Sequence, residues 1–129
     1  AGCQEAVILN REGYVAECSG DNIFIVRGGE LWTPSADNGA LDGITKGIVI
    51  GIAAGLGIAI HQGSITQYDL YTADECFLTG TGAEIMPVIS VDGRIIGNGG
   101  TGRLTNLLIQ GFGRYIENAM STAAPAVVA

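Results

Sequence analysis

Positively charged residues are scarce in this chain of 129 residues: it contains 6 Lys and Arg against 13 Asp and Glu, a formal net charge of −7. Proteins that bind nucleic acids neutralise phosphates with clustered lysines and arginines. The sequence has no such cluster, so we expect no nucleic-acid partner. An anionic small molecule is not excluded, but backbone amides would have to hold it more than cationic side chains do.

Histidine and cysteine are also few. The sequence has one His and three Cys, and Cys3, Cys18 and Cys76 form no C-x-x-C pair, which argues against a zinc site. We therefore expect no metal. Widely spaced thiols in odd number fit a reducing compartment better than an oxidising one, which favours a cytoplasmic location.

Long hydrophobic runs are missing as well. The longest apolar stretch, residues 47–60, is shorter than the roughly 20 residues that span a bilayer, and it includes four glycines. We interpret it as a buried helix that leads into a strand, and we expect no membrane association. No signal peptide is visible at the start, AGCQEAVILN. Because the first residue is Ala1 rather than Met, the sequence looks cut or processed at its front.

Glycine, in contrast, is abundant, with 21 of 129 residues. The three prolines and the lack of a G-X-Y period exclude collagen and proline-rich disorder. Glycines are therefore expected in turns, at close backbone approaches and in tight packing. Hydrophobic residues make up 47% of the chain, enough for the core of one domain.

Local patterns predict three hairpins, each with two apolar runs around a turn. Their arms cover residues 5–10 and 14–17, 22–27 and 30–33, and 87–91 and 94–96. Gly28-Gly29 and Asp92-Gly93 are the turns of the second and third hairpins. Further strands are predicted over 58–61 and 75–79.

Two longer helices are predicted. The first begins with Asp42 as N-cap and ends at Gly57. Its apolar face, at a spacing of four, consists of Ile44, Ile48, Ile52 and Leu56. The second begins near Thr101 and is amphipathic; residues 66–72 form a short helix, and 121–129 a flexible tail. The pattern predicts an α+β fold with a mixed sheet, several hairpins and two longer helices.

Two segments are candidate anion sites. At the helix start Gly43-Ile44-Thr45, free amides and the helix dipole can hold a phosphate, although an ordinary capped helix begins in the same way. The turn Thr79-Gly80-Thr81-Gly82 can form a nest of amides and hydroxyls, or simply satisfy its own backbone.

Residues 97–102 match G-x-G-x-x-G, but we reject a dinucleotide site because the preceding strand belongs to a hairpin and no βα repeat follows. Glu17, at the end of a strand before a tight turn, and Glu84 are candidate acids; each also fits a surface or structural role. His61 is interpreted as structural.

Three segments together resemble the C-terminal part of the branched-chain amino acid aminotransferases, in the class IV (fold type IV) pyridoxal-phosphate enzymes. They read GYVAECSGDNIF (13–24), LDGITK (41–46) and ADECFLTGTGAE (73–84), the last followed by Pro87-Val88. Asp92-Gly93-Arg94, Ile96-Gly97 and Thr105 extend the similarity. The departures are Cys18, Gly82 and Lys46, where the family commonly has glycine, alanine and arginine.

The resemblance implies the barrel-like C-terminal domain of these enzymes, with pyridoxal 5'-phosphate as cofactor. Glu17 would pair with the pyridine nitrogen, and Leu41 would pack on the cofactor ring. The positions that would hold the cofactor phosphate are Gly43, Ile44, Thr45 and Thr81. Thr81 and Gly82 would take the substrate carboxylate.

The resemblance also implies the activity: transfer of an amino group from branched-chain amino acids to 2-oxoglutarate, in a cytoplasmic homo-oligomer, with a small-molecule amino acid and 2-oxo acid as partners. No catalytic residue is expected in this chain, because the family's Schiff-base lysine would lie upstream of Ala1. We expect a fragment, inactive alone, with a cofactor-binding domain over 1–120, a tail over 121–129 and the N-terminal domain absent. The alternative is a non-catalytic, stand-alone phosphate-binding or interaction module.

Overall fold

The centre of the fold is a five-stranded sheet. The computed structural model describes residues 6–18, 20–40, 43–80 and 84–123. The strands are β3 (Asn22–Arg27), β4 (Glu30–Pro34), β5 (Ile60–Gly63), β6 (Glu75–Gly80) and β7 (Glu84–Pro87), in the order β5-β4-β3-β6-β7. Only β4 and β5 pair in parallel. The predicted α+β fold with a mixed sheet is thus confirmed.

The three predicted hairpins are present. The first joins β1 (Val7–Leu9) to β2 (Val15–Cys18), the second joins β3 to β4, and the third joins β8 (Ser90–Val91) to β9 (Arg94–Ile95). The third is shorter than predicted. Its expected first arm is divided, because residues up to Pro87 pair with β6 as a separate strand, β7.

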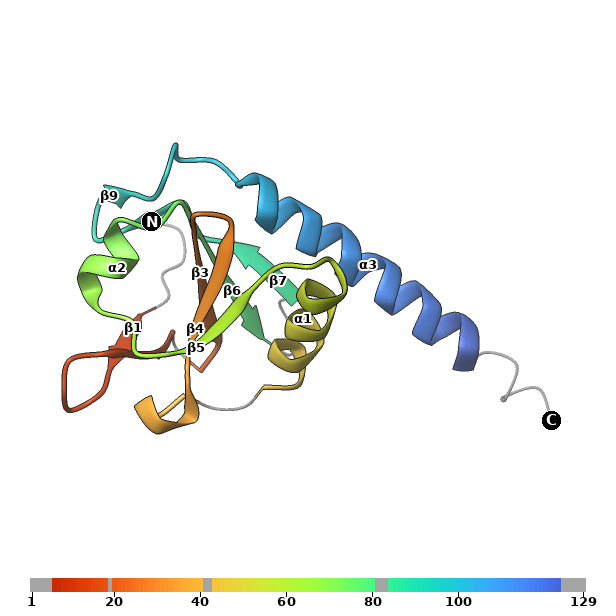
Figure 1. The fold of residues 1–129 in the computed structure, drawn as a ribbon, viewed down its shortest axis with the longest axis horizontal. Helices are drawn as coiled ribbons and strands as arrows, with labels where there is room; N and C mark the ends of the chain where they lie inside the picture. Colours follow the sequence, from red (N-terminus) through yellow and green to blue (C-terminus); the bar gives the residue numbers. More distant parts are fainter. Residues whose placement is uncertain (1–5, 19, 41–42, 81–83, 124–129) are drawn as a thin grey trace.

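Three α-helices flank the sheet: α1 (Ile44–Gly55), α2 (Gln67–Tyr71) and α3 (Arg103–Ala123). A 3₁₀ turn, η1 (Ala36–Asn38), follows β4. Figure 1 shows α1 and α3 together on one side of the sheet, with α2 and the β1–β2 hairpin on the other. No helix in the described ranges is long and apolar enough to cross a membrane.

Each face of the sheet carries its own hydrophobic cluster. On the side of α1 and α3, Phe24 and Phe77 stack with ring centroids 4.8 Å apart and pack with Val49 and Leu108. On the other side, Ile23 and other residues pack beneath α2 and β2. The two clusters follow the alternation of side chains along β3 and β6.

The predicted buried face of α1 is largely wrong. Ile44 is 81% exposed, and the fully buried positions are Val49 and Ala53. The polar residues of the helix, Thr45 and Lys46, are both buried, so no polar stripe marks its solvent side and a spacing of four fits several faces equally. The N-cap is Gly43 rather than Asp42, which lies outside the described residues. The expected stop at Gly57 agrees with its positive φ of 77°.

Helix α3 continues to Ala123, and residues 124–129 lie outside the described part. The division of the chain at residue 120 stays a prediction.

The start of α2 provides a pH-dependent contribution to stability. Asp69 and Thr66 form a reciprocal capping box, and the backbone N–H of Thr66 donates to the Asp69 carboxylate at 2.9 Å. This hydrogen bond lowers the pKa of the Asp69 carboxyl below its usual value. The guanidinium of Arg27, whose Nη1 lies 3.2 Å from Asp69 Oδ1, lowers it further. A carboxylate with a lowered pKa stabilises the fold above its ordinary pKa and loses that contribution as the pH falls through the folded-state value.

We therefore expect Asp69→Asn to cost about 1 kcal/mol of the free energy of unfolding at pH 7 and much less at pH 2. Urea unfolding midpoints at the two pH values measure this difference. Asp37→Asn, at an exposed position on η1, is the control. An equal loss for Asp69→Asn at both pH values would contradict the assignment.

Candidate functional site

The amino end of α1 has no side-chain cap. Its N-cap is Gly43, with φ −70° and ψ 150°, and no side-chain cap hydrogen bond is made there. The first amides of an α-helix have no acceptor within the helix. Those of Ile44 and Thr45 therefore face the space before the helix, where the dipole favours an anion.

The other two helices begin differently. At the start of α2, the capping box of Thr66 and Asp69 satisfies backbone N–H groups. At α3, the Glu75 carboxylate accepts hydrogen bonds from the backbone N–H groups of Leu104 and Thr105 at 3.1 and 2.8 Å. A Cβ at Gly102 would overlap the Glu75 side chain. Glu75 thus occupies the helix start after the G-x-G-x-x-G match, which supports the rejection of a dinucleotide site there.

Thr45 joins the two predicted anion segments. It is 9% exposed, and its hydroxyl donates to the carbonyl oxygen of Gly80 at 3.5 Å, the outer limit of a hydrogen bond. Gly80 is the last residue of β6 and directly precedes the predicted turn. The structure therefore brings the start of α1 next to the end of β6.

Two close contacts fix the backbone at these places. The side chain of Asn22 lies against Gly43, and that of Asp21 lies against Gly80, so closely that a Cβ at either glycine would collide with it. Both glycines therefore serve close approaches of the backbone, as the sequence predicted for this residue type.

Glu17 is close in sequence to Asp21 and Asn22. It lies on β2, partly buried, and the next residue, Cys18, forms two backbone hydrogen bonds with Asp21 at 2.9 and 2.8 Å. This tight turn leads directly into Asn22 and β3. Among the described contacts, none joins the Glu17 carboxylate to α1, so its predicted meeting with the cofactor ring stays a prediction.

Three predicted site residues, Leu41, Thr81 and Gly82, lie outside the described residues, as does the side chain of Glu84. Their roles stay predictions. The predicted phosphate-binding positions within the described ranges are Gly43, Ile44 and Thr45, and these are together at one helix start.

Lys46 and His61 have structural contacts. Lys46 is 2% exposed, and its Nζ donates to the carbonyl oxygen of Pro34 at 3.2 Å. His61 lies 2.8 Å from a Glu30 carboxylate oxygen and stacks on Trp32, with ring centroids 4.0 Å apart. The interpretation of His61 as structural agrees with these contacts.

Sequence reasoning gave no role to Asp21 or Asn22, and it named Thr79 only as part of a turn that could form an anion nest. The hydroxyl of Thr79 is buried and has no hydrogen-bond partner in the described part of the chain. Asn22 and Thr79 face each other across β3 and β6. Two polar residues opposite each other on otherwise apolar strands are a usable signal, but only once the register of these distant strands is known.

A cleft of about 760 Å³ lies on the opposite face of the sheet. Its lining combines apolar residues, among them Val7, Leu70, Leu78 and Val88, with polar groups. The polar groups include Gln67 and the hydrogen-bonded pair of Tyr71 and Asp92 (2.7 Å). Among the described residues, none of the predicted site residues lines this cleft.

The sequence model described as Amino-transferase class IV matches residues 1–91. The chain belongs to the class IV aminotransferase family. The branched-chain-amino-acid aminotransferase of Pseudomonas aeruginosa is 46% identical over 107 residues, which are 83% of this chain and 34% of that protein.

Comparison with solved structures gives the same family. The branched-chain amino acid aminotransferase of Escherichia coli has a TM-score of 0.84 at 43% identity, over 86% of this chain and 37% of that one. The T.th. branched-chain amino acid aminotransferase complexed with N-(5'-phosphopyridoxyl)-L-glutamate has a TM-score of 0.80 at 43% identity, with the same coverage of 86% and 37%. The chain spans 34% to 39% of the length of the curated relatives of this group, and corresponds to their C-terminal portion.

Proposed function

We propose that this chain is the C-terminal, cofactor-binding part of a longer aminotransferase, called the whole protein below, that uses pyridoxal 5'-phosphate to transfer the amino group of branched-chain amino acids to 2-oxoglutarate. The observation that carries the proposal is the uncapped start of α1, with Gly43 as N-cap and the buried Thr45. This start lies beside the end of β6. The chain is also 43% identical to a solved relative that is complexed with a phosphopyridoxyl compound.

The residues present fit the phosphate of this cofactor. The amides of Ile44 and Thr45 have no acceptor in the helix, and a glycine N-cap leaves no side chain in their way. The long bond from Thr45 to Gly80 leaves its hydroxyl able to turn toward an anion. Thr79, which pairs with Asn22 across β3 and β6, has a buried hydroxyl without a partner among the described residues. The net charge of −7 matters little, because amides and hydroxyls supply the donors.

The site residues of the chain then have defined roles. Pyridoxal phosphate, when bound, supplies the electron sink that amino-group transfer needs. Ile44 and Thr45 bind its phosphate, and the Glu17 carboxylate holds a proton on the ring nitrogen by its negative charge. Thr81 provides a further phosphate contact, and the amides of Thr81 and Gly82 bind the substrate carboxylate.

The remaining groups belong to the proposed N-terminal part. This part supplies the lysine and packs on the cleft lined by Val7, Leu70, Leu78 and their neighbours. We propose that the whole protein is a cytoplasmic homo-oligomer.

Incubation of the purified whole protein with pyridoxal phosphate, 2-oxoglutarate and leucine, valine or isoleucine tests the proposal. Formation of glutamate is the expected result, and alanine and aspartate serve as control amino donors. Cofactor binding without turnover on any donor would overturn the proposed reaction and favour the non-catalytic module. Failure to bind the cofactor would overturn the proposal as a whole.

A further inference from the structure

Asn22 holds the residue from which α1 starts. It is the first residue of β3 and 5% exposed, and its side-chain oxygen Oδ1 accepts a hydrogen bond from the backbone N–H of Gly43 at 3.2 Å. A Cβ at Gly43 would collide with this same oxygen. The Asn22 side chain therefore fixes the position of the N-cap, and with it the direction in which the next two amides point.

A second observation indicates that a polar ligand belongs beside Asn22. Thr79 is the direct partner of Asn22 in the antiparallel pair of β3 and β6, so both side chains emerge on the same face. By the alternation along each strand, this is the face of Phe24 and Phe77, which α1 covers. The Thr79 side chain is 1% exposed, and its hydroxyl has no hydrogen-bond partner in the described ranges. Buried hydroxyls are rarely left so unless a ligand or water meets them.

The chemistry of an amide suits this place better than that of a carboxylate. Asparagine offers a neutral acceptor to the Gly43 N–H and adds no charge next to the helix start. Aspartate would accept the same hydrogen bond, but its negative charge would repel a phosphate held by the amides of Ile44 and Thr45.

We propose that Asn22 is a positioning residue for the cofactor phosphate: it does not touch the phosphate but aims the amides at the start of α1 that bind it. The inference rests on the proposed function, because it names how the proposed phosphate site is held in shape. It adds Asn22 to a phosphate site for which the family resemblance implied Gly43, Ile44, Thr45 and Thr81.

The test compares two forms of the cofactor, which separates a phosphate effect from a general loss of structure. Whole protein freed of cofactor is titrated with pyridoxal 5'-phosphate and, separately, with pyridoxal, which lacks the phosphate. Asn22→Ala removes the acceptor, and Asn22→Asp keeps the shape and the acceptor but adds charge. Absorbance of the bound cofactor gives the dissociation constants without any measurement of turnover.

We expect Asn22→Ala to bind pyridoxal 5'-phosphate about tenfold more weakly, the effect of losing about one hydrogen bond. Asn22→Asp should also bind it more weakly, because its negative charge repels the phosphate. The affinity of both variants for pyridoxal should be unchanged. Asn98→Ala is the matched control, because Asn98 Oδ1 also accepts a hydrogen bond from a glycine N–H, that of Gly100 at 3.0 Å, at an exposed turn outside the site. This variant should bind both forms like the unchanged protein.

Equal weakening for the two cofactor forms in Asn22→Asp, which keeps the shape of the side chain, would overturn the positioning role, and so would unchanged binding of both forms. If the unchanged protein binds neither form, the proposed function itself fails. The two failures are therefore distinguishable.

Discussion

The 129-residue chain alone should show no transamination, a complete loss relative to the whole protein. Amino-group transfer in pyridoxal-phosphate enzymes needs a lysine amine as nucleophile and proton carrier. The sequence contains one lysine, Lys46, and the carbonyl oxygen of Pro34 accepts a hydrogen bond from its buried Nζ. Glutamate formation from leucine and 2-oxoglutarate measures the loss.

Lys46→Arg in the whole protein provides the control for this prediction. Arginine keeps the positive charge and can donate to Pro34, but its guanidinium does not act as a nucleophilic amine. The family commonly has arginine at this position, so we expect the variant to remain active. Turnover by the isolated chain, or abolished activity in a folded Lys46→Arg protein, would show that Lys46 has a catalytic role after all.

Glu17→Gln is expected to lower kcat of the whole protein about 10²–10³-fold, the cost of removing one preorganised electrostatic group. Glutamine keeps the size of the side chain and removes the negative charge that holds the proton on the ring nitrogen. Because Glu17 lies partly buried on β2 and its carboxylate has no described hydrogen bond, the fold should tolerate the change.

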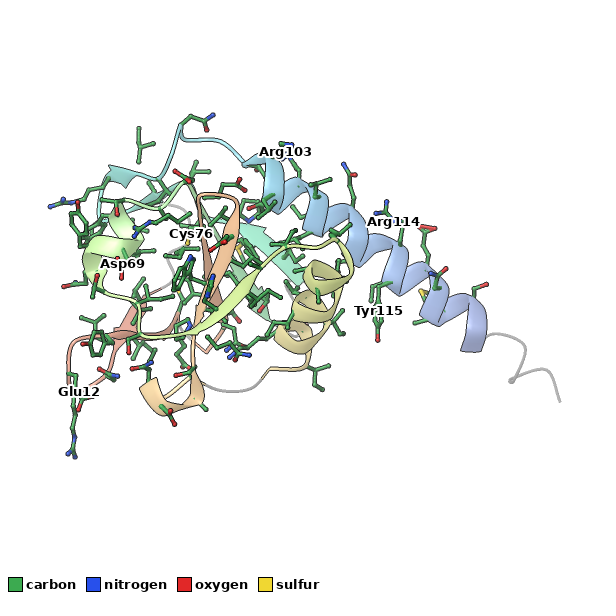
Figure 2. The ribbon with its side chains drawn as sticks, in the orientation of Figure 1. Glu12, Asp69, Cys76, Arg103, Arg114 and Tyr115 are labelled. Carbon is green, nitrogen blue, oxygen red and sulfur yellow. The ribbon has the colours of Figure 1, made fainter. Side chains whose placement is uncertain are left out.

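Glu12→Gln is the matched control, since Glu12 is exposed at the outer tip of the β1–β2 hairpin (Figure 2). It removes the same charge and should leave kcat unchanged. Measured rates at saturating cofactor separate the effect on the reaction from weaker binding. Full activity of Glu17→Gln would refute the assigned pairing.

Elements formed by neighbouring residues could be predicted from the sequence. The hairpins around Gly28-Gly29 and Asp92-Gly93 form where dipeptides adopt left-handed backbone angles: φ is 60° and 77° in the first turn, 53° and 75° in the second. The helix start at residues 43–45, where we propose that a phosphate binds, was predictable for the same reason, since a helix start is a local feature.

Long-range packing could not be predicted. The exposed side of α1 depends on where α3 and β6 lie, and its residues after Lys46, all of them apolar or glycine, do not encode that choice. The contact between Asn22 and Gly43 joins residues 21 apart, and the bond from Thr45 to Gly80 joins residues 35 apart. No local pattern reports such pairs, so the role of Asn22, and its pairing with Thr79, became visible only in the structure.

The same distances have a consequence for folding. β3 must pair with β6 before Asn22 and Thr79 face each other, and closing such a long loop makes non-local pairing slow. The hairpins can form early, while the proposed phosphate site becomes complete only when the central sheet does. A ligand that binds only the completed sheet stabilises the native state by mass action. Cofactor added during refolding should therefore raise the yield of folded protein. It should have little effect on the rate at which the first hairpins form.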